Sequence, residues 1–196
     1  MKHHTLLPLA ACALLSACQS APDFTGTYLF KPEQMIASAS ESVADGYWDA
    51  PSGLTGEHLI VVDTELQQAK YYIGGKQVGI SAISSGKAGH GTPRGTFSII
   101  SKDINHKSST YGSIVDSAGN VLIADYTRGS STPIPAGGIY KGAEMNFGMQ
   151  ITSSGIWMHE GIVTSAPESH GCIRLPRKMA KIFYENTPVG TKIIIK

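Results

Sequence analysis

The sequence predicts a mostly β domain with one or two short helices. Glycine contributes 22 and proline 10 of the 196 residues, and both residue types favour turns and short strands over long helices. Runs rich in β-branched residues recur between these turns from residue 57 onward. One segment, residues 176–186, spaces its apolar residues as an amphipathic helix does. The length suits a single domain with a real core.

The expected strands begin with a meander. Residues 58–63 and 68–73 form the first pair, and the Gly74-Gly75 turn leads into a third strand at 76–84. The turn at residues 92–95 comes before the next strand. The remaining expected strands lie at 96–101, 121–124, 146–152, 155–159 and 191–195.

Two helices are expected. The first is short, lies around residues 32–39 and is entered at a proline. The second begins at Pro176 and places Met179, Ile182 and Phe183 on one face.

The charge balance excludes one class of function. Sixteen Lys and Arg face fifteen Asp and Glu, for a formal net charge of +1. A nucleic-acid binder working through a broad basic surface is therefore excluded. With 41% hydrophobic and 16% charged residues, the chain is also too apolar to be disordered.

The N-terminus, residues 1–17, has the pattern of a secretory signal peptide. Lys2 supplies a positive start, and residues 5–15 form an apolar run broken only by Pro8. A bilayer-spanning helix needs about 20 apolar residues, so this run is too short to cross a membrane. We interpret residues 1–17 as an export signal.

The end of this signal, Leu15-Ser16-Ala17-Cys18, resembles the bacterial lipobox. The resemblance implies cleavage before Cys18 and lipidation of its thiol; the alternative is an ordinary signal peptide that ends near a cysteine. Gln19, in place of an aspartate, resembles the outer-membrane sorting pattern. We therefore expect an exported lipoprotein anchored through Cys18, at the outer membrane and facing the periplasm.

The stretch from residue 18 to residue 56 is rich in Ser, Ala, Pro and Gly and has little periodicity. We interpret it as a tether between the lipidated cysteine and a domain at residues 57–196.

The cysteine count singles out Cys172. Cys12 lies in the discarded signal and Cys18 is lipidated, which leaves one thiol in an exported chain and no internal disulfide. A lone thiol is either buried filler or a reactive group.

The neighbours of Cys172 favour reactivity. A thiol attacks as a thiolate and needs a base, and two histidines, His159 and His170, are available. Strand alternation does not choose between them, because Gly171 makes a tight turn more natural than a regular strand. Gly171 also lets backbone amides approach a ligand closely, as an oxyanion hole requires.

Two segments of the chain, residues 86–97 and 156–175, together resemble the L,D-transpeptidase family, also called the YkuD domain. An upstream histidine, a Ser-His-Gly-Cys-x-Arg box and a Thr-Pro-x-Gly-x-Phe element occur in the family's order. The resemblance runs from about residue 57 to residue 196. It implies a β-rich catalytic domain built as a mixed sheet or sandwich.

The resemblance also implies residue roles. Cys172 would be the nucleophile and His159 the general base and acid, while the amides of Gly171 and Cys172 would hold the oxyanion. Residues 92–97 would set a hairpin under the cleft. The residues expected to shape the site and contact the substrate are Ser169, His170 and Arg174.

The implied reaction is acyl transfer on peptidoglycan stem peptides, without a metal or cofactor. Cys172 would take the acyl group at the third-position diamino acid and pass it to an amine. Two alternatives stay open: a carboxypeptidase or endopeptidase that uses water at the same site, and a non-catalytic wall-binding lipoprotein. Cys172, His170 and His159 are also zinc-binding residue types, but their spacing lacks a usual zinc pattern.

One residue departs from the family pattern. The family has glycine directly after the base histidine, whereas Glu160 stands here between His159 and Gly161. Its carboxylate would either orient the imidazole or face solvent at a strand end. The other histidines near the domain's strands, His58, His90 and His106, are expected at the surface or in loops.

Overall fold

The computed structural model describes residues 45–196. Several expectations from the sequence lie outside the described residues: the expected signal peptide at 1–17, the expected lipidation site Cys18, the helix expected around 32–39 and most of the expected tether. No helix within 45–196 is long and apolar enough to cross a membrane.

The first sheet has six strands and is mixed. Strands β2, β3 and β4 form the expected antiparallel meander, whereas β11 pairs parallel to β2 and antiparallel to β5. In spatial order the strands are β1 (Gly46–Trp48), β4 (Lys76–Ala82), β3 (Gln68–Ile73), β2 (His58–Asp63), β11 (Lys192–Ile195) and β5 (Gly95–Ser98).

The second sheet has five strands and carries the site. Its one parallel pair joins β9 to β10, and the other pairs are antiparallel. In spatial order the strands are β10 (Ile173–Leu175), β9 (Trp157–Glu160), β8 (Ile139–Gln150), β6 (Ser101–Val115) and β7 (Val121–Thr127). Two mixed sheets with a single short helix in the described part confirm the expected fold class.

One hydrophobic core lies between the sheets and helix α2 (Arg177–Asn186). Tyr71 and Phe183 are fully buried at its centre, with ring centroids 5.2 Å apart. Helix α2 follows Pro176, as expected, and buries Met179 and Phe183 while packing against β1, β8, β9 and β10. At the C-terminal end of α2, Lys102 Nζ donates to the carbonyl oxygens of Tyr184 and Thr187. A positive charge there interacts favourably with the helix dipole.

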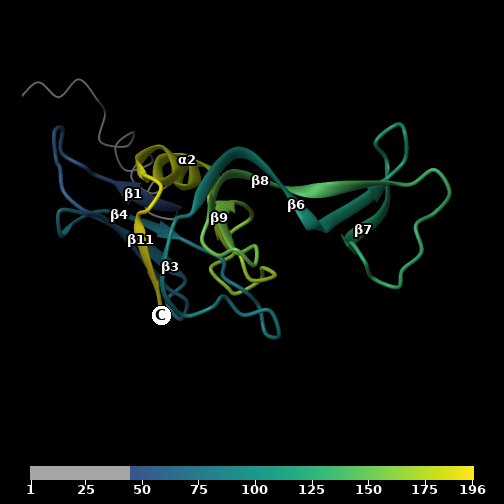
Figure 1. Ribbon diagram of the computed structural model, residues 1–196, viewed down its shortest axis with the longest axis horizontal. Helices are drawn as coiled ribbons and strands as arrows, with labels where there is room; N and C mark the ends of the chain where they lie inside the picture. The colour runs from purple at the N-terminus through teal and green to yellow at the C-terminus, as the bar shows by residue number, and fades with distance from the viewer. Residues whose placement is uncertain (1–44) are drawn as a thin grey trace, which may run out of the picture.

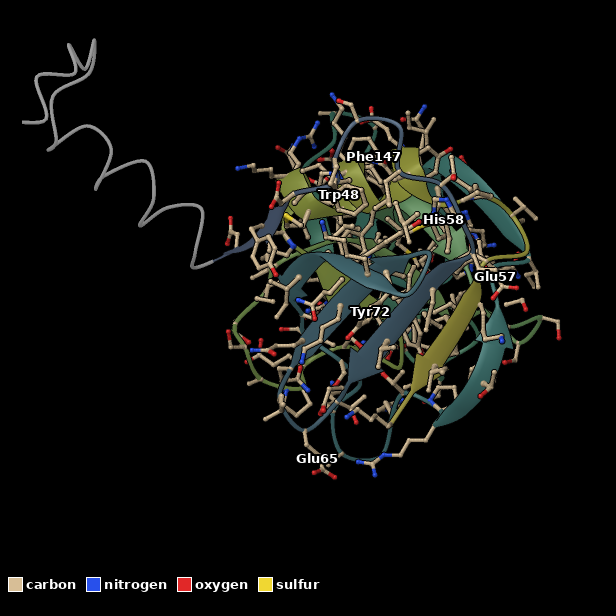
Figure 2. All side chains as sticks on the ribbon, turned by 90° about the vertical axis from the view of Figure 1, so that its left-hand side faces the viewer. Trp48, Glu57, His58, Glu65, Tyr72 and Phe147 are labelled. Carbon is tan, nitrogen blue, oxygen red and sulfur yellow. The ribbon has the colours of Figure 1, made fainter. Side chains whose placement is uncertain are left out.

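Strand β1 begins the first sheet before residue 57, the start of the domain expected from the sequence. Trp48 packs edge-on against Tyr71, with ring centroids 5.0 Å apart, and also contacts Phe183. Figure 2 looks onto this sheet, with Trp48 and His58 at one end and Glu65 at the other. Part of the segment interpreted as a tether is therefore built into the domain.

Four further features differ from the sequence prediction. Strand β6 was missed, although it is the longest strand described, and so was the short strand β10. Strand β8 begins at Ile139, earlier than expected. Finally, β5 does not form a hairpin under the cleft, because its partner is β11, which comes last of the strands in the sequence.

Strands β6 and β8 continue beyond the core as an arm, here defined as residues 108–142. Figure 1 shows this arm projecting from the domain, with β7 as its third strand. Between Lys107 and Gly112 the register of β6 against β8 shifts. The part of β6 and β8 on the domain side of this shift forms one wall of the site.

Candidate active site

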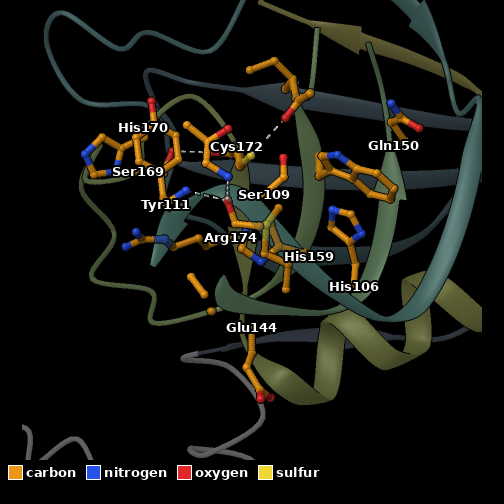
Figure 3. A pocket seen from close by; sticks show the side chains of 18 of the residues that line it. His106, Ser109, Tyr111, Glu144, Gln150, His159, Ser169, His170, Cys172 and Arg174 are labelled. Carbon is orange, nitrogen blue, oxygen red and sulfur yellow. Dashed lines mark hydrogen bonds between the residues drawn. The ribbon is translucent and has the colours of Figure 1, made fainter. Parts of the chain in front are cut away.

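A cleft of about 800 Å³ runs along β6, β8 and β9 to the turn before β10. Figure 3 shows the side chains that line it, with Cys172 and His159 among them. The described residues thus bring the expected nucleophile and base into one cleft. Ser169, His170 and Arg174 line the same cleft.

Cys172 lies immediately before β10, which pairs parallel to the strand that carries His159. It is the one free cysteine in the described part of the chain. Its thiol points to the carbonyl oxygen of Gly155, 3.8 Å from Sγ. Burial raises the pKa of the thiol, while a backbone hydrogen bond from Trp157 and the charge of Arg174 act in the opposite direction. At neutral pH the resting sulfur is therefore a protonated thiol.

His159 is buried near the end of β9, with 7% of its surface exposed. Its Nδ1 lies 2.6 Å from the backbone oxygen of Glu160. A carbonyl oxygen only accepts, so Nδ1 carries the hydrogen and Nε2 keeps its lone pair. Burial lowers the pKa of His159 to about 4, with smaller contributions from the charges of Arg174 and His106, although the bond to Glu160 raises it. The imidazole is therefore neutral at working pH, with Nε2 as its basic atom.

The turn from Ser169 to Cys172 is held by hydrogen bonds of the Ser169 side chain. Ser169 is buried, and its Oγ donates to the carbonyl of Cys172 and accepts from the N–H of Gly171. Gly171 has φ 111°, and a Cβ there would lie 2.9 Å from Ile156 Cδ1, so only glycine fits. The expectation of a free Gly171 amide is not met, because that N–H is already occupied by Ser169.

The N–H of Cys172 differs from that of Gly171. Among residues 45–196 it has no hydrogen-bond acceptor. It is therefore the backbone donor beside the sulfur that is free to bind a ligand oxygen. Ser169, expected to contact the substrate, instead holds the turn that presents this amide.

The turn is also tied to the first sheet. Thr92 Oγ1 donates to the carbonyl of Gly171, 2.9 Å away, and accepts from the N–H of Gly86 at 2.8 Å. Arg174 exchanges two backbone hydrogen bonds with Ser84, each 3.0 Å long. Thr92 thus bonds the threonine-proline element to the catalytic turn, although the two are 79 residues apart in the sequence. It fixes the catalytic turn from below.

His170 belongs to an aromatic wall. Its ring stacks on Tyr111 with centroids 4.4 Å apart, and His90 meets it edge-on at 5.0 Å. Burial lowers the pKa of His170, and the charges of Lys87 and Arg174 lower it further, whereas Asp125 raises it. His170 thus connects the catalytic turn to the arm through Tyr111.

Arg174 lies opposite His159 in the β9–β10 register. A Cβ on Gly161 would lie 2.9 Å from Arg174 Cγ, so the stem of the arginine packs directly on that glycine. A larger residue at position 161 would therefore displace the Arg174 side chain. The Arg174 side chain is half-buried and its charge lines the cleft.

Glu160 takes neither of the two roles expected from the sequence. Both of its carboxylate oxygens lie 2.9 Å from Nη1 of Arg177, the first residue of α2. The imidazole of His159 is oriented by the backbone oxygen of Glu160 instead. The extra residue therefore joins the end of β9 to the helix without placing a carboxylate on the base.

The sequence analysis was wrong about His106, which lies in the cleft on β6. Its ring stacks face to face on Trp157, with centroids 3.8 Å apart, and its Nδ1 lies 3.3 Å from Asp103. Tyr111 and Glu144 also line the cleft and were not singled out. The only sequence signal for them was the alternation along a polar strand.

Within residues 45–196, no three side chains of His, Cys, Asp or Glu are grouped so that they could hold a metal ion.

Structural comparison finds the same fold in several L,D-transpeptidases. One from Mycobacterium smegmatis is 26% identical with a TM-score of 0.53, over 72% of this chain and 59% of that one. A mutant L,D-transpeptidase from Enterococcus faecium is 24% identical with a TM-score of 0.52, over 72% and 50%. An L,D-transpeptidase in complex with imipenem is 17% identical with a TM-score of 0.52, over 87% and 88%.

The chain thus spans about three fifths of the Mycobacterium smegmatis structure and half of the Enterococcus faecium one. No curated protein matches the chain. The family model of the L,D-transpeptidase catalytic domain, YkuD, matches residues 57–195. That match takes in the cleft's cysteine, both of its neighbouring histidines and the threonine-proline element, and on this basis the chain belongs to the L,D-transpeptidase family.

Proposed function

We propose that the protein is a cysteine-dependent L,D-transpeptidase acting on peptidoglycan stem peptides. The observation that carries this proposal is the pairing of a lone thiol and a histidine in one cleft, with the histidine's Nδ1 held by a backbone oxygen. That arrangement leaves Nε2 as the atom that takes and returns a proton. The substrate bond is the one after the L-centre of the third-position diamino acid.

The first half-reaction starts from neutral partners. Cys172 passes its proton to Nε2 of His159 as the sulfur attacks the carbonyl carbon, because burial disfavours both a free thiolate at Cys172 and an imidazolium at His159. A C–S bond forms and the C–N bond to the terminal D-alanine breaks. The proton on His159 then goes to the leaving amine.

The oxyanion formed in this step is bound by the free N–H of Cys172. The N–H of Gly171 joins it only if Ser169 Oγ releases its present bond. Arg174 supplies the positive charge in the cleft that a substrate carboxylate requires. In the second half-reaction the acyl group passes to an amine.

The test is incubation of the protein with a disaccharide-tetrapeptide, followed by mass spectrometry of the products. Release of D-alanine with formation of a peptide dimer supports transpeptidation. Release without a dimer identifies water as the acceptor and the enzyme as a carboxypeptidase. A folded protein that releases no D-alanine and forms no dimer would contradict the proposal.

Cys172→Ala is the decisive variant, and it should remain folded while losing all acyl transfer. Imipenem, which is bound by one structural relative, serves as a second probe: its covalent mass addition should disappear in the same variant. Cys18→Ser is the matched control, because it removes a different cysteine and should retain both reactions. Activity in folded Cys172→Ala would exclude a cysteine mechanism.

We also propose that this domain acts as a lipoprotein, held through Cys18 at the outer membrane on its periplasmic side. The support is the Leu-Ser-Ala-Cys sequence at the end of a short apolar run and the glutamine that follows it. This location would place the cleft beside peptidoglycan.

A further inference from the structure

A second imidazole shares the cleft with His159. His106 projects from β6 and lies flat on the Trp157 indole, with centroids 3.8 Å apart and planes at 18°. The backbone of Trp157 in turn contacts the sulfur of Cys172. Trp157 therefore contacts both groups: its ring stacks on His106, and its backbone N–H donates to the sulfur of Cys172. Figure 3 shows both histidines on the same side of the cleft.

Asp103 sets the orientation of His106. Its carboxylate lies 3.3 Å from Nδ1, and a carboxylate only accepts, so Nδ1 carries the hydrogen and Nε2 has the free lone pair. Less than a quarter of the His106 side chain is exposed. The structure thus contains a histidine with a basic nitrogen and a paired carboxylate that the first half-reaction does not use.

The second half-reaction has a use for such a group. An amine of the lysine type has a pKa of about 10.4, so at pH 7 only about one molecule in 2,500 is the free nucleophile. An incoming ammonium group must lose one proton before it attacks and another as the amide forms. His159 can accept only one of them.

We propose that His106 is the base that takes the first proton from the acceptor ammonium group. This inference rests on the proposed transpeptidase function. The ammonium proton passes to Nε2 of His106, and the neutral amine attacks the thioester carbonyl. A C–N bond forms, the C–S bond breaks and sulfur leaves with the electron pair. The second amine proton goes to Nε2 of His159, which returns it to Cys172, while His106 releases its proton to solvent.

The other groups around His106 are less suited to this role. Glu144 on β8 is paired with Lys107 at 3.4 Å, and that pair lowers the pKa of the carboxyl. Arg174 on β10 is positive. The other titratable groups that line the cleft are each engaged as described above: Tyr111, His159, Glu160, His170 and Cys172.

The experiment separates the two half-reactions. His106→Phe keeps an aromatic ring on Trp157 but removes the basic nitrogen. Acylation is measured as the first-turnover burst of D-alanine release and as imipenem mass addition, and transfer is measured as dimer formation from the tetrapeptide. The exposed neighbour Asn105, on the same strand, provides the control Asn105→Ala.

We expect His106→Phe to be acylated at close to the wild-type rate but to form dimer at least about tenfold more slowly at pH 7. The deficit should shrink as the pH rises toward the pKa of the amine, because more acceptor is then already neutral. Asp103→Asn should give a smaller deficit of the same kind.

Three outcomes would overturn the inference: normal dimer formation in His106→Phe, an equal loss in both half-reactions, or a deficit that does not change with pH. A wild-type protein that is never acylated would instead contradict the proposed function. The two failures are therefore distinguishable.

Discussion

Glu160 turns its carboxylate to Arg177, whose Nη1 lies 2.9 Å from both carboxylate oxygens, while its backbone oxygen orients His159. The two functions of this residue are therefore separable by mutation. The ion pair with Arg177 depends on the Glu160 side chain, whereas the hydrogen bond to His159 needs only the backbone oxygen.

Glu160→Gln should retain acyl transfer within a few-fold of the parent. It removes an ion pair in which Arg177 is 71% exposed, and such surface pairs stabilise a protein by about 0–1 kcal/mol. Rates of D-alanine release and a denaturant titration would check both points. A loss as large as that of a catalytic base would show that the carboxylate acts on His159 after all.

His159→Gln should reduce acylation by about 10²–10⁴-fold, the usual contribution of a general base. His170→Gln should cost roughly tenfold or less, since it removes a stacking contact of about 0.5–1.5 kcal/mol with Tyr111. Imipenem acylation rates for the two variants, each shown to be folded by circular dichroism, make the comparison. If the order were reversed, His170 would be the base.

Stability should depend on pH through His159. Its pKa is about 4 in the folded chain and about 6.5 when unfolded, so between these values the unfolded chain binds the extra proton. Stability is full above pH 6.5 and falls by about 3 kcal/mol as the pH drops to 4. Denaturant unfolding at several pH values would show this fall in the parent and its absence in His159→Gln. If the free energy of unfolding fell equally with pH in the parent and in His159→Gln, His159 would not be the group responsible.

Cys18→Ser should release the protein from membranes into the soluble periplasmic fraction without changing the activity of the domain. Each buried CH₂ contributes about 0.8 kcal/mol, and durable anchoring takes more than one acyl chain, as lipoprotein processing supplies. Fractionation at high salt with immunodetection provides the measurement. A variant that still sediments with membranes would point to another anchor.

The core strands were predictable, whereas the arm and part of the cleft were not. Strands such as β2 and β3 alternate buried and half-buried residues between turn signals, which is the pattern that sequence reasoning detects. Strand β6 is mostly polar, and only its last two residues, Ile114 and Val115, are buried. It is held by ladder hydrogen bonds to β7 and β8, and these leave no hydrophobic signal in the sequence.

The same difference explains the site. Cys172, His159 and the turn between Ser169 and Arg174 could be identified from a short motif. The stacking of His106 on Trp157 joins residues 51 positions apart, and the pairing of Glu160 with Arg177 depends on where α2 begins. Such contacts are set by tertiary structure.

Strand β11 lies between β2 and β5 in the first sheet. Strands β2 and β5 do not pair with each other, so residues 192–195 must be synthesised before the first sheet can form in full. During synthesis the preceding strands therefore stay without their central partner, and a deletion of these four residues would split the sheet. The first sheet therefore closes only after residues 58–63 have paired with residues 192–195, which lie far from them in the sequence.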